Sequence, residues 1–185
     1  MLATFADAAR VPMDARFIVD GEREVRGWTF NMVESYKPFG DIAACMLDGV
    51  PGVRLVSKGK PAAIYHTVPV RVKPGETYVL KAKARGRGKG SLVFFAYGPK
   101  WLWKGSHGTP FKNAADLNAS PLPVEAKFVV PDGVETIRPV LSVPGGSEVE
   151  FFDVTLEKEG GIGCSRDVFF RRLQSVSEWP QAPAR

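Results

Sequence analysis

The sequence lacks the features on which membrane-spanning and metal-dependent proteins rely. No apolar run approaches the roughly 18 consecutive residues that a membrane helix needs, so no membrane span is predicted. The two histidines are too few for a three-histidine metal site and too far apart for an HExxH motif. Two cysteines, Cys45 and Cys164, form no CxxC pair, which argues against a redox or zinc motif. Whether these two thiols form a disulfide is left open by the sequence.

Catalytic motifs are also scarce. No GxSxG nucleophile motif occurs. The glycine-rich run 86–91 lacks the spacing of a P-loop, and it joins two predicted strands instead of opening a helix. Paired carboxylates for glycoside hydrolysis need two facing groups at a set separation, which a sequence does not display. We therefore expect a binding protein that is not an enzyme.

The charge balance excludes little by itself. The formal net charge is +5, from 25 basic and 20 acidic residues. This is a modest excess, so no specific nucleic-acid partner is predicted. Five basic residues nevertheless line up along one predicted strand and its turn, namely Lys81, Lys83, Arg85, Arg87 and Lys89. Either a solvated sheet face or a surface for an acidic polysaccharide explains them.

What the sequence does contain is a series of short strands. Its 19 glycines and 15 prolines suit many turns. Segment 62–72 alternates Ile64 and His66 on one side with Tyr65 on the other, and it ends at a Pro-Gly turn. Segment 77–85 alternates in the same way, so we expect these two strands to form a hairpin. Further strands are predicted at 16–20, 27–33, 52–57, 91–97, 125–130, 136–143 and 148–157.

This pattern predicts one all-β domain, an antiparallel β-sandwich, flanked by two tails. We place an N-terminal arm at 1–15, the sandwich at 16–158 and a C-terminal tail at 159–185. Ser165 would cap a short amphipathic helix in that tail, with Phe169 and Leu173 on its apolar face. An irregular tail is the alternative.

The order of motifs resembles the galactose-binding-like jelly-roll superfamily, in particular carbohydrate-binding modules appended to xylanases and other glycoside hydrolases. The resemblance covers about 16–158. It rests on Gly27-Trp28, on the run 63–80 with its Pro-Gly-Glu-Thr-Tyr turn, and on the closing run 149–156, Val-Glu-Phe-Phe-Asp-Val-Thr-Leu. It implies a jelly-roll sandwich, a polysaccharide or oligosaccharide partner and an extracellular or cell-surface location.

The start of the chain does not decide that location. It lacks the charged and apolar regions of a signal peptide, although Ala6-Asp7-Ala8 has the small-x-small form of a cleavage site. A frayed, alanine-rich start fits equally well.

The resemblance also implies a structural calcium ion where the first and last strands meet. Asp153 matches the second acid of the family's usual Asp-Asp pair, whereas Phe152 replaces the first. Asp20, Glu22 and Glu24 would supply the other oxygen ligands, since calcium prefers several carboxylates.

The most unusual segment is 97–113, which we interpret as a loop. If it is extended at Trp101 and Trp103, both indoles lie on one side and Leu102 on the other. Two adjacent indoles suit the C–H face of a pyranose ring, with polar side chains reaching its hydroxyls. We expect Lys104, His107 and Asn113 to do so. The alternative is a Trp-x-Trp plug at one end of the sandwich.

Other aromatic residues receive a structural interpretation. Trp28 and Tyr78 are predicted in the core, and His66 is predicted to be buried and hydrogen-bonded. Tyr36 lies in an irregular stretch, 35–41, that borders the ligand groove by resemblance, so it is a further candidate contact.

Two functions follow from this reading. The first is a carbohydrate-binding module that grips glycan through Trp101 and Trp103. The second is an assembly subunit that uses the sandwich as scaffold and self-associates through its tails, because Phe169, Phe170, Leu173 and Trp179 are more apolar than a linker needs.

Overall fold

The computed structural model describes residues 8–18, 24–31, 40–112 and 119–160. Cys164 and the tail at 161–185, with its predicted helix and self-association, lie outside the described residues. The same is true of Asp20, Glu22, Tyr36 and Asn113, and of the side chain of Glu24. The part of the chain that is described holds no helix that would reach across a bilayer.

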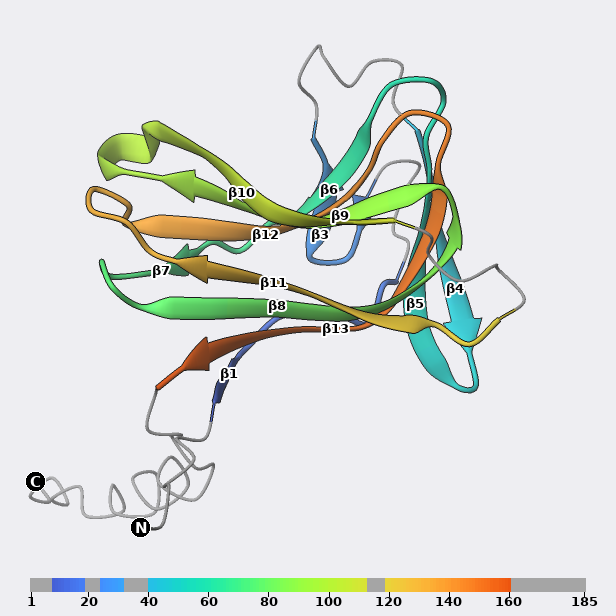
Figure 1. The fold of residues 1–185 in the computed structure, drawn as a ribbon, viewed down its shortest axis with the longest axis horizontal. Helices are drawn as coiled ribbons and strands as arrows, with labels where there is room; N and C mark the ends of the chain where they lie inside the picture. The colour runs from blue at the N-terminus through green and yellow to red at the C-terminus, as the bar shows by residue number, and fades with distance from the viewer. Residues whose placement is uncertain (1–7, 19–23, 32–39, 113–118, 161–185) are drawn as a thin grey trace, which may run out of the picture.

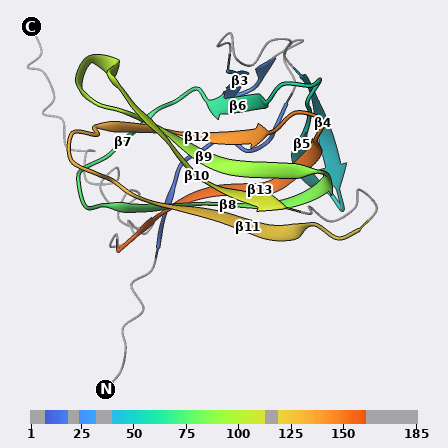
Figure 2. The ribbon, with the colours of Figure 1, turned by 45° about the horizontal axis from the view of Figure 1, so that its top comes forward.

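Two antiparallel sheets form the molecule, stacked as two layers (Figures 1 and 2). Sheet A holds, in order, β11 (Leu122–Val129), β8 (Thr77–Arg87), β13 (Glu148–Glu159), β5 (Val50–Val56) and β4 (Asp41–Leu47), and β1 (Ala9–Val11) pairs with β13. Sheet B holds β10 (Trp103–Lys112), β9 (Lys89–Tyr97), β12 (Thr136–Val143), β6 (Ala62–His66), β3 (Trp28–Phe30) and β2 (Glu24–Val25), and β7 (Val70–Arg71) pairs with β12. The predicted β-sandwich of jelly-roll type is confirmed.

Consecutive strands repeatedly change sheet, and this overturns the predicted hairpin between segments 62–72 and 77–85. The first segment forms β6 and β7 in sheet B, whereas β8 belongs to sheet A. The Pro-Gly turn at 74–75 therefore crosses from one layer to the other. The alternating pattern correctly placed Ile64 and His66 of β6, and Leu80, Ala82 and Ala84 of β8, on the buried side. It did not show which sheet a strand joins, because both sheets bury one face.

The core lies between the layers and follows the predicted alternation. Leu80, Ala82 and Ala84 of β8 face inward opposite Leu92 and Phe94 of β9. Trp28 and Tyr78 are buried, as predicted. The largest fully buried side chains are Phe17, Trp28, Phe30, Phe94, Phe151, Phe152, Leu55, Ile64, Leu80, Leu92, Ile137 and Leu141.

The segment interpreted as a loop is instead mostly a strand. β10 runs along β9 at the edge of sheet B, from Trp103 opposite Tyr97 to Lys112 opposite Lys89. Its glycines and Pro110 prompted the loop interpretation. An edge strand tolerates proline, because the unpaired side of the strand has no partner to lose.

Candidate functional site

Aromatic side chains gather on the outward face of sheet B. Phe95 and Tyr97 stand on β9, Tyr65 on β6 and Trp103 on β10, and Trp101 comes from the short 3-10 turn η2 (Pro99–Trp101) between β9 and β10. We call this group, together with Arg138 of β12, the platform. The β9–β10 connection lies at the end of the sandwich where β7 also lies (Figure 1).

Tyr97 holds the two tryptophans of the platform side by side. Its ring centre is 5.5 Å from that of Trp101 and 5.4 Å from that of Trp103, and both contacts are edge-on. Phe95 makes a similar contact with Trp103 at 5.3 Å. Edge-to-face packing is a favoured arrangement of aromatic pairs. The rings therefore support one another across β9 and β10.

A tight turn, and not an extended strand, presents Trp101. Lys100 and Trp101 have φ values of 52° and 63°, in the left-handed region that non-glycine residues seldom occupy. The turn is closed by a hydrogen bond from the Leu102 N–H to the Pro99 carbonyl, at 3.1 Å. Both indoles contact the Tyr97 ring, although Trp101 does not have the extended backbone on which the expectation of a shared side depended. Strained backbone of this kind is often found at functional sites.

Both indoles of the platform are open to solvent. Trp101 is 55% exposed and Trp103 is 52% exposed, and Leu102 between them is exposed as well. A plug at the end of the sandwich would be buried, so the structure does not favour that alternative. Exposed large apolar side chains gathered on one surface are typical of binding sites.

Arg138 joins the platform as its cation. Its guanidinium carbon lies 5.1 Å from the centre of the Tyr65 ring and 5.2 Å from that of Trp101. Both distances are within the range of cation–π attraction. The Arg138 Nε is buried and has no hydrogen-bond partner among the described residues.

Two predicted ligand contacts do not join the platform. Lys104 lies against the backbone of Gly98 and Gly133, where an added Cβ on Gly98 would come within 2.8 Å of its Cε. His107 packs its ring on Phe128 of β11, with centres 4.9 Å apart, and it stands opposite the inward-facing Phe94. The other two, Tyr36 and Asn113, lie outside the described residues.

Four members of the platform were missed by sequence reasoning: Tyr65, Phe95, Tyr97 and Arg138. Tyr65 and Tyr97 fall on the outward side of the alternation, next to the buried Ile64 and Ala96. That signal was present in the sequence. Arg138 becomes a neighbour of these rings only through the register of β12 against β9, in which it stands opposite Phe95.

A polar hollow adjoins Trp101 at the end of the sandwich. Its volume is about 730 Å³, and its walls include Arg71, Lys100, Glu135 and Tyr78. Glu76 also lines it, and this carboxylate is bound by Lys158 at 2.6 Å and by the Tyr78 hydroxyl at 3.0 Å. Burial, followed by the bond to Glu76, raises the pKa of Tyr78.

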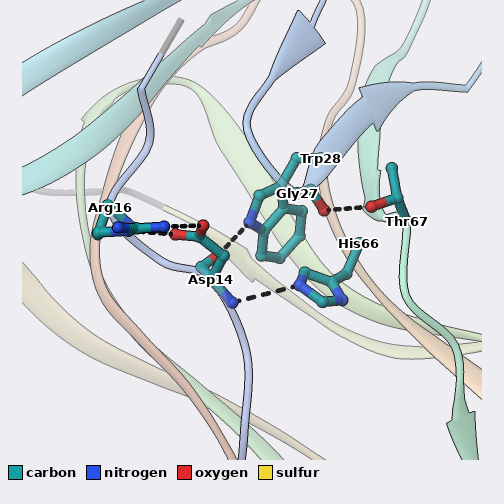
Figure 3. Close-up of polar contacts among 6 residues, drawn as sticks. All are labelled: Asp14, Arg16, Gly27, Trp28, His66 and Thr67. Atoms are coloured by element: carbon teal, nitrogen blue, oxygen red, sulfur yellow. Dashed lines mark hydrogen bonds and ion pairs between the residues drawn. The ribbon is translucent and has the colours of Figure 1, made fainter.

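A second aromatic group, which includes His66 next to Tyr65 on β6, is built differently (Figure 3). The Trp28 indole N–H donates to the Asp14 carbonyl at 2.7 Å, and the Asp14 N–H donates to Nε2 of His66 at 3.3 Å. His66 Nδ1 lies 2.9 Å from the Val68 carbonyl, so this nitrogen carries the proton. We call Asp14, Trp28 and His66 the latch, because they join the segment 12–17 to sheet B.

The latch has the character of a structural element. Trp28 is 1% exposed and packs edge-on against the His66 ring. Gly27 has a φ of +80°, and a Cβ there would approach the Asp14 Cβ to 3.0 Å, so the site needs a glycine. Burial lowers the pKa of His66 and so keeps the ring neutral, in which state Nε2 can accept the Asp14 N–H.

The outward face of sheet A carries most of the basic stripe, which we define as Lys81, Lys83, Arg85, Arg87 and Lys89. Lys81 pairs with Glu157, Lys83 with Asp153 and Arg85 with Glu150, at 2.5 to 2.7 Å. Arg54 pairs with Glu148 and Lys127 with Glu159. Carboxylates from β13 thus neutralise most of the stripe.

The predicted calcium site is only partly described. Asp153 sits at a β-bulge in β13 with a φ of 50°, and its carboxylate is bound to Lys83. The described residues contain no group of three or more acids, histidines or cysteines that could hold a metal. The described side chains alone do not fit the ion, so the prediction depends on Asp20, Glu22 and Glu24.

Comparison with known proteins identifies the fold but not a family. No protein-family model and no curated protein matches the sequence. The structure resembles the CBM22-1–GH10 modules of the Clostridium thermocellum endo-1,4-β-D-xylanase 10B, solved with xylohexaose: the TM-score is 0.58 at 14% identity, over 83% of this chain and 29% of that chain. It also resembles the CBM22-1 xylan-binding domain of Paenibacillus barcinonensis Xyn10C, with a TM-score of 0.52 at 9% identity over 86% of this chain and 99% of that chain.

A third similar structure is the enzymatically active domain of bacteriophage CBA120 tailspike protein 4. Its TM-score is 0.54 at 12% identity, over 71% of this chain and 19% of that chain. Identities this low show a shared fold, and one fold hosts many functions. The resemblance to carbohydrate-binding modules of the jelly-roll type is confirmed at that level.

Proposed function

We propose that this domain binds a glycan on the platform, without a catalytic role of its own. The observation that carries the proposal is the pair of half-exposed indoles, Trp101 and Trp103, held edge-on against Tyr97 at the end of sheet B. Support at the level of the fold comes from the structural likeness to a domain that is described as xylan-binding.

The chemistry of the platform suits a sugar ring. The faces of Trp101 and Trp103 offer apolar area for the C–H groups of a pyranose, and their N–H groups can donate to its hydroxyls. Neither indole N–H donates to a described residue, so both are available for a ligand. Lys100, which precedes Trp101 in the same turn, and the adjacent hollow supply further polar groups.

The scaffold would hold this surface in place before ligand arrives. Trp103 is anchored by the paired strands β9 and β10, and Trp101 by the hydrogen-bonded turn between them. A preformed surface loses little conformational entropy on binding. An extracellular or cell-surface location follows as part of the proposal, because polysaccharides of this kind lie outside the cell.

The test is binding of the whole chain to a panel of soluble polysaccharides, by affinity electrophoresis and calorimetry. Trp101→Ala and Trp103→Ala should each weaken binding by about tenfold or more, since central aromatic anchors dominate such contacts. Met46→Ala is the matched control, because Met46 is an exposed apolar residue on β4 of the other sheet.

The control variant should bind as the parent does. Two results would contradict the proposal. One is a parent protein that binds no member of the panel, and the other is a pair of tryptophan variants that bind as tightly as the parent while keeping its melting temperature.

A further inference from the structure

The basic side chains on the two outward faces of the sandwich have different partners. On sheet A, each of Lys81, Lys83 and Arg85 is bound to a carboxylate of β13. On sheet B, Arg138 stands in the centre of the sheet, and the described residues provide it with no carboxylate. Its neighbours are the rings of Tyr65 and Trp101.

This environment leaves the hydrogen-bonding capacity of Arg138 unused. A guanidinium has five N–H donors, and aromatic faces attract its charge without accepting most of them. The Nε is buried, and no described residue accepts its proton. Arg54 also has a buried Nε without a partner, but its guanidinium is bound by Glu148. Among the described residues, Arg138 has no such acid.

Neither of the two described carboxylates that line the adjacent hollow forms an ion pair with Arg138. Glu76 is occupied by Lys158 and Tyr78, and Glu135 lines the hollow without an ion pair to Arg138. Arg71 and Lys100 line that same hollow, which adds positive charge beside Trp101. The platform therefore combines surface for a sugar ring with an excess of cationic groups.

We infer that the platform takes an acidic sugar, a uronate whose carboxylate is bound by Arg138 while its ring stacks on Trp101 or Trp103. This inference rests on the proposed function and narrows it. Two rings hold the guanidinium, and its planar fork matches a carboxylate in a two-point contact. A bound carboxylate would also supply the partner that Arg138 lacks among the described residues.

Pairs of ligands that differ only in the sugar carboxylate test its contribution to binding separately from that of the sugar ring. The probes are glucuronoxylan and oligogalacturonate, each compared with the same material after its carboxyl groups have been reduced to alcohols, and a sulfated dextran. The full chain should bind at least one uronate about tenfold more tightly than its reduced form, the gain expected for hydrogen bonds to a charged group.

Three variants assign that preference to a residue. Arg138→Gln should remove the preference for the uronate while the reduced glycan still binds. Arg138→Lys keeps the charge but not the fork, so it should keep only part of the preference, and it serves if the glutamine variant does not fold. Arg87→Gln is the control, because it removes one exposed positive charge from sheet A and should change nothing.

The outcomes separate the inference from the proposed function. A parent that binds reduced and uronate forms equally overturns the inference and leaves glycan binding intact. The same holds if Arg138→Gln weakens both forms equally, if Arg87→Gln removes the preference as well, or if only the sulfated dextran is preferred. Absence of binding to every glycan, neutral or acidic, would instead remove the proposed function.

Discussion

Sheet B carries tryptophan in two places, and the two places differ in how their polar atoms are bound. In the latch, Trp28 is 1% exposed and its N–H donates to Asp14, while both nitrogens of His66 have partners. On the platform, Trp101 and Trp103 are half exposed, and the Arg138 Nε has no partner among the described residues.

The difference separates residues that hold the fold from residues that are available to a ligand. Buried polar atoms in folded proteins are almost always hydrogen-bonded, and the latch obeys that rule. The platform leaves donors unsatisfied beside apolar rings that remain open to solvent. Residue type alone would not have told the two apart, since each place combines indole, ring stacking and a basic side chain.

Truncating the tryptophans should produce the largest difference in stability between a change in the latch and a change in the platform. Trp28→Ala should lower the free energy of unfolding by about 3 to 5 kcal/mol, because it opens a cavity and removes a buried hydrogen bond. The double change Trp101→Ala and Trp103→Ala should cost only about 1 to 2 kcal/mol, from lost ring and cation–π contacts.

Urea titrations of the three proteins, followed by circular dichroism, measure both values. A variant with the same m-value as the parent, that is, the same slope of unfolding free energy against urea concentration, would have kept the native fold. A double variant that is as unstable as Trp28→Ala would show that the platform indoles belong to the core.

A bound calcium ion would be a second structural element beside the latch, because its predicted ligands lie close in sequence to the segment that the latch holds. Asp20, Glu22 and Glu24 follow the latch segment 12–17 directly in the chain. If they and Asp153 bind the ion, calcium at 100 times its dissociation constant should stabilise the fold by about 2.7 kcal/mol. Chelator should remove that gain in melting experiments, and Asp153→Asn should abolish the response.

An acidic residue elsewhere provides the control for that experiment. Asp41→Asn removes a carboxylate that pairs with Lys58 at 2.8 Å on an exposed edge strand, so this variant should still respond to calcium. An identical melting curve for the parent with chelator and with calcium would contradict the site.

Much of the fold could be predicted from the alternation of side chains. The strand at 136–143 has the predicted bounds, and those at 77–85, 91–97 and 148–157 extend by only a few residues. Two of the strands that were not predicted share one cause, which is exposure. β4 and β10 are edge strands whose side chains face solvent on much of their surface, so their sequences show little apolar periodicity.

The candidate site was predicted less completely, because it depends on contacts between strands. Trp101 and Trp103 could be found from two nearby indoles in a glycine-rich segment. Arg138 could not, because its position beside Tyr65 depends on the order of β9, β12 and β6 in the sheet. The sharp turn at Lys100 was also beyond the pattern, since neither it nor Trp101 normally adopts a positive φ.

His66 was predicted to be buried and hydrogen-bonded, which the structure confirms. Its protonation should have the smallest effect on stability of the changes considered. Burial lowers the pKa of His66 in the folded state below its ordinary value of 6.5. Above pH 6.5 the ring is neutral in both states, so stability does not depend on it. Below that pH the unfolded chain takes up a proton that the folded chain resists, so stability falls by at most about 1.4 kcal/mol for each pH unit until the folded pKa is reached.

Urea titrations between pH 7.5 and 5.5 should therefore show a lower stability at the lower pH in the parent, with a loss of at most about 1.4 kcal/mol. His66→Gln cannot take up a proton, so its stability should be lower at pH 7.5 but nearly flat over this range. His107→Gln should keep the slope of the parent, because His107 lies outside the latch, against Phe128. Since protonation at Nε2 removes the acceptor of the Asp14 N–H, hydrogen exchange in the segment 12–17 should rise at the lower pH in the parent. A parent with no steeper pH dependence than His66→Gln would show that this histidine does not fasten the segment to sheet B.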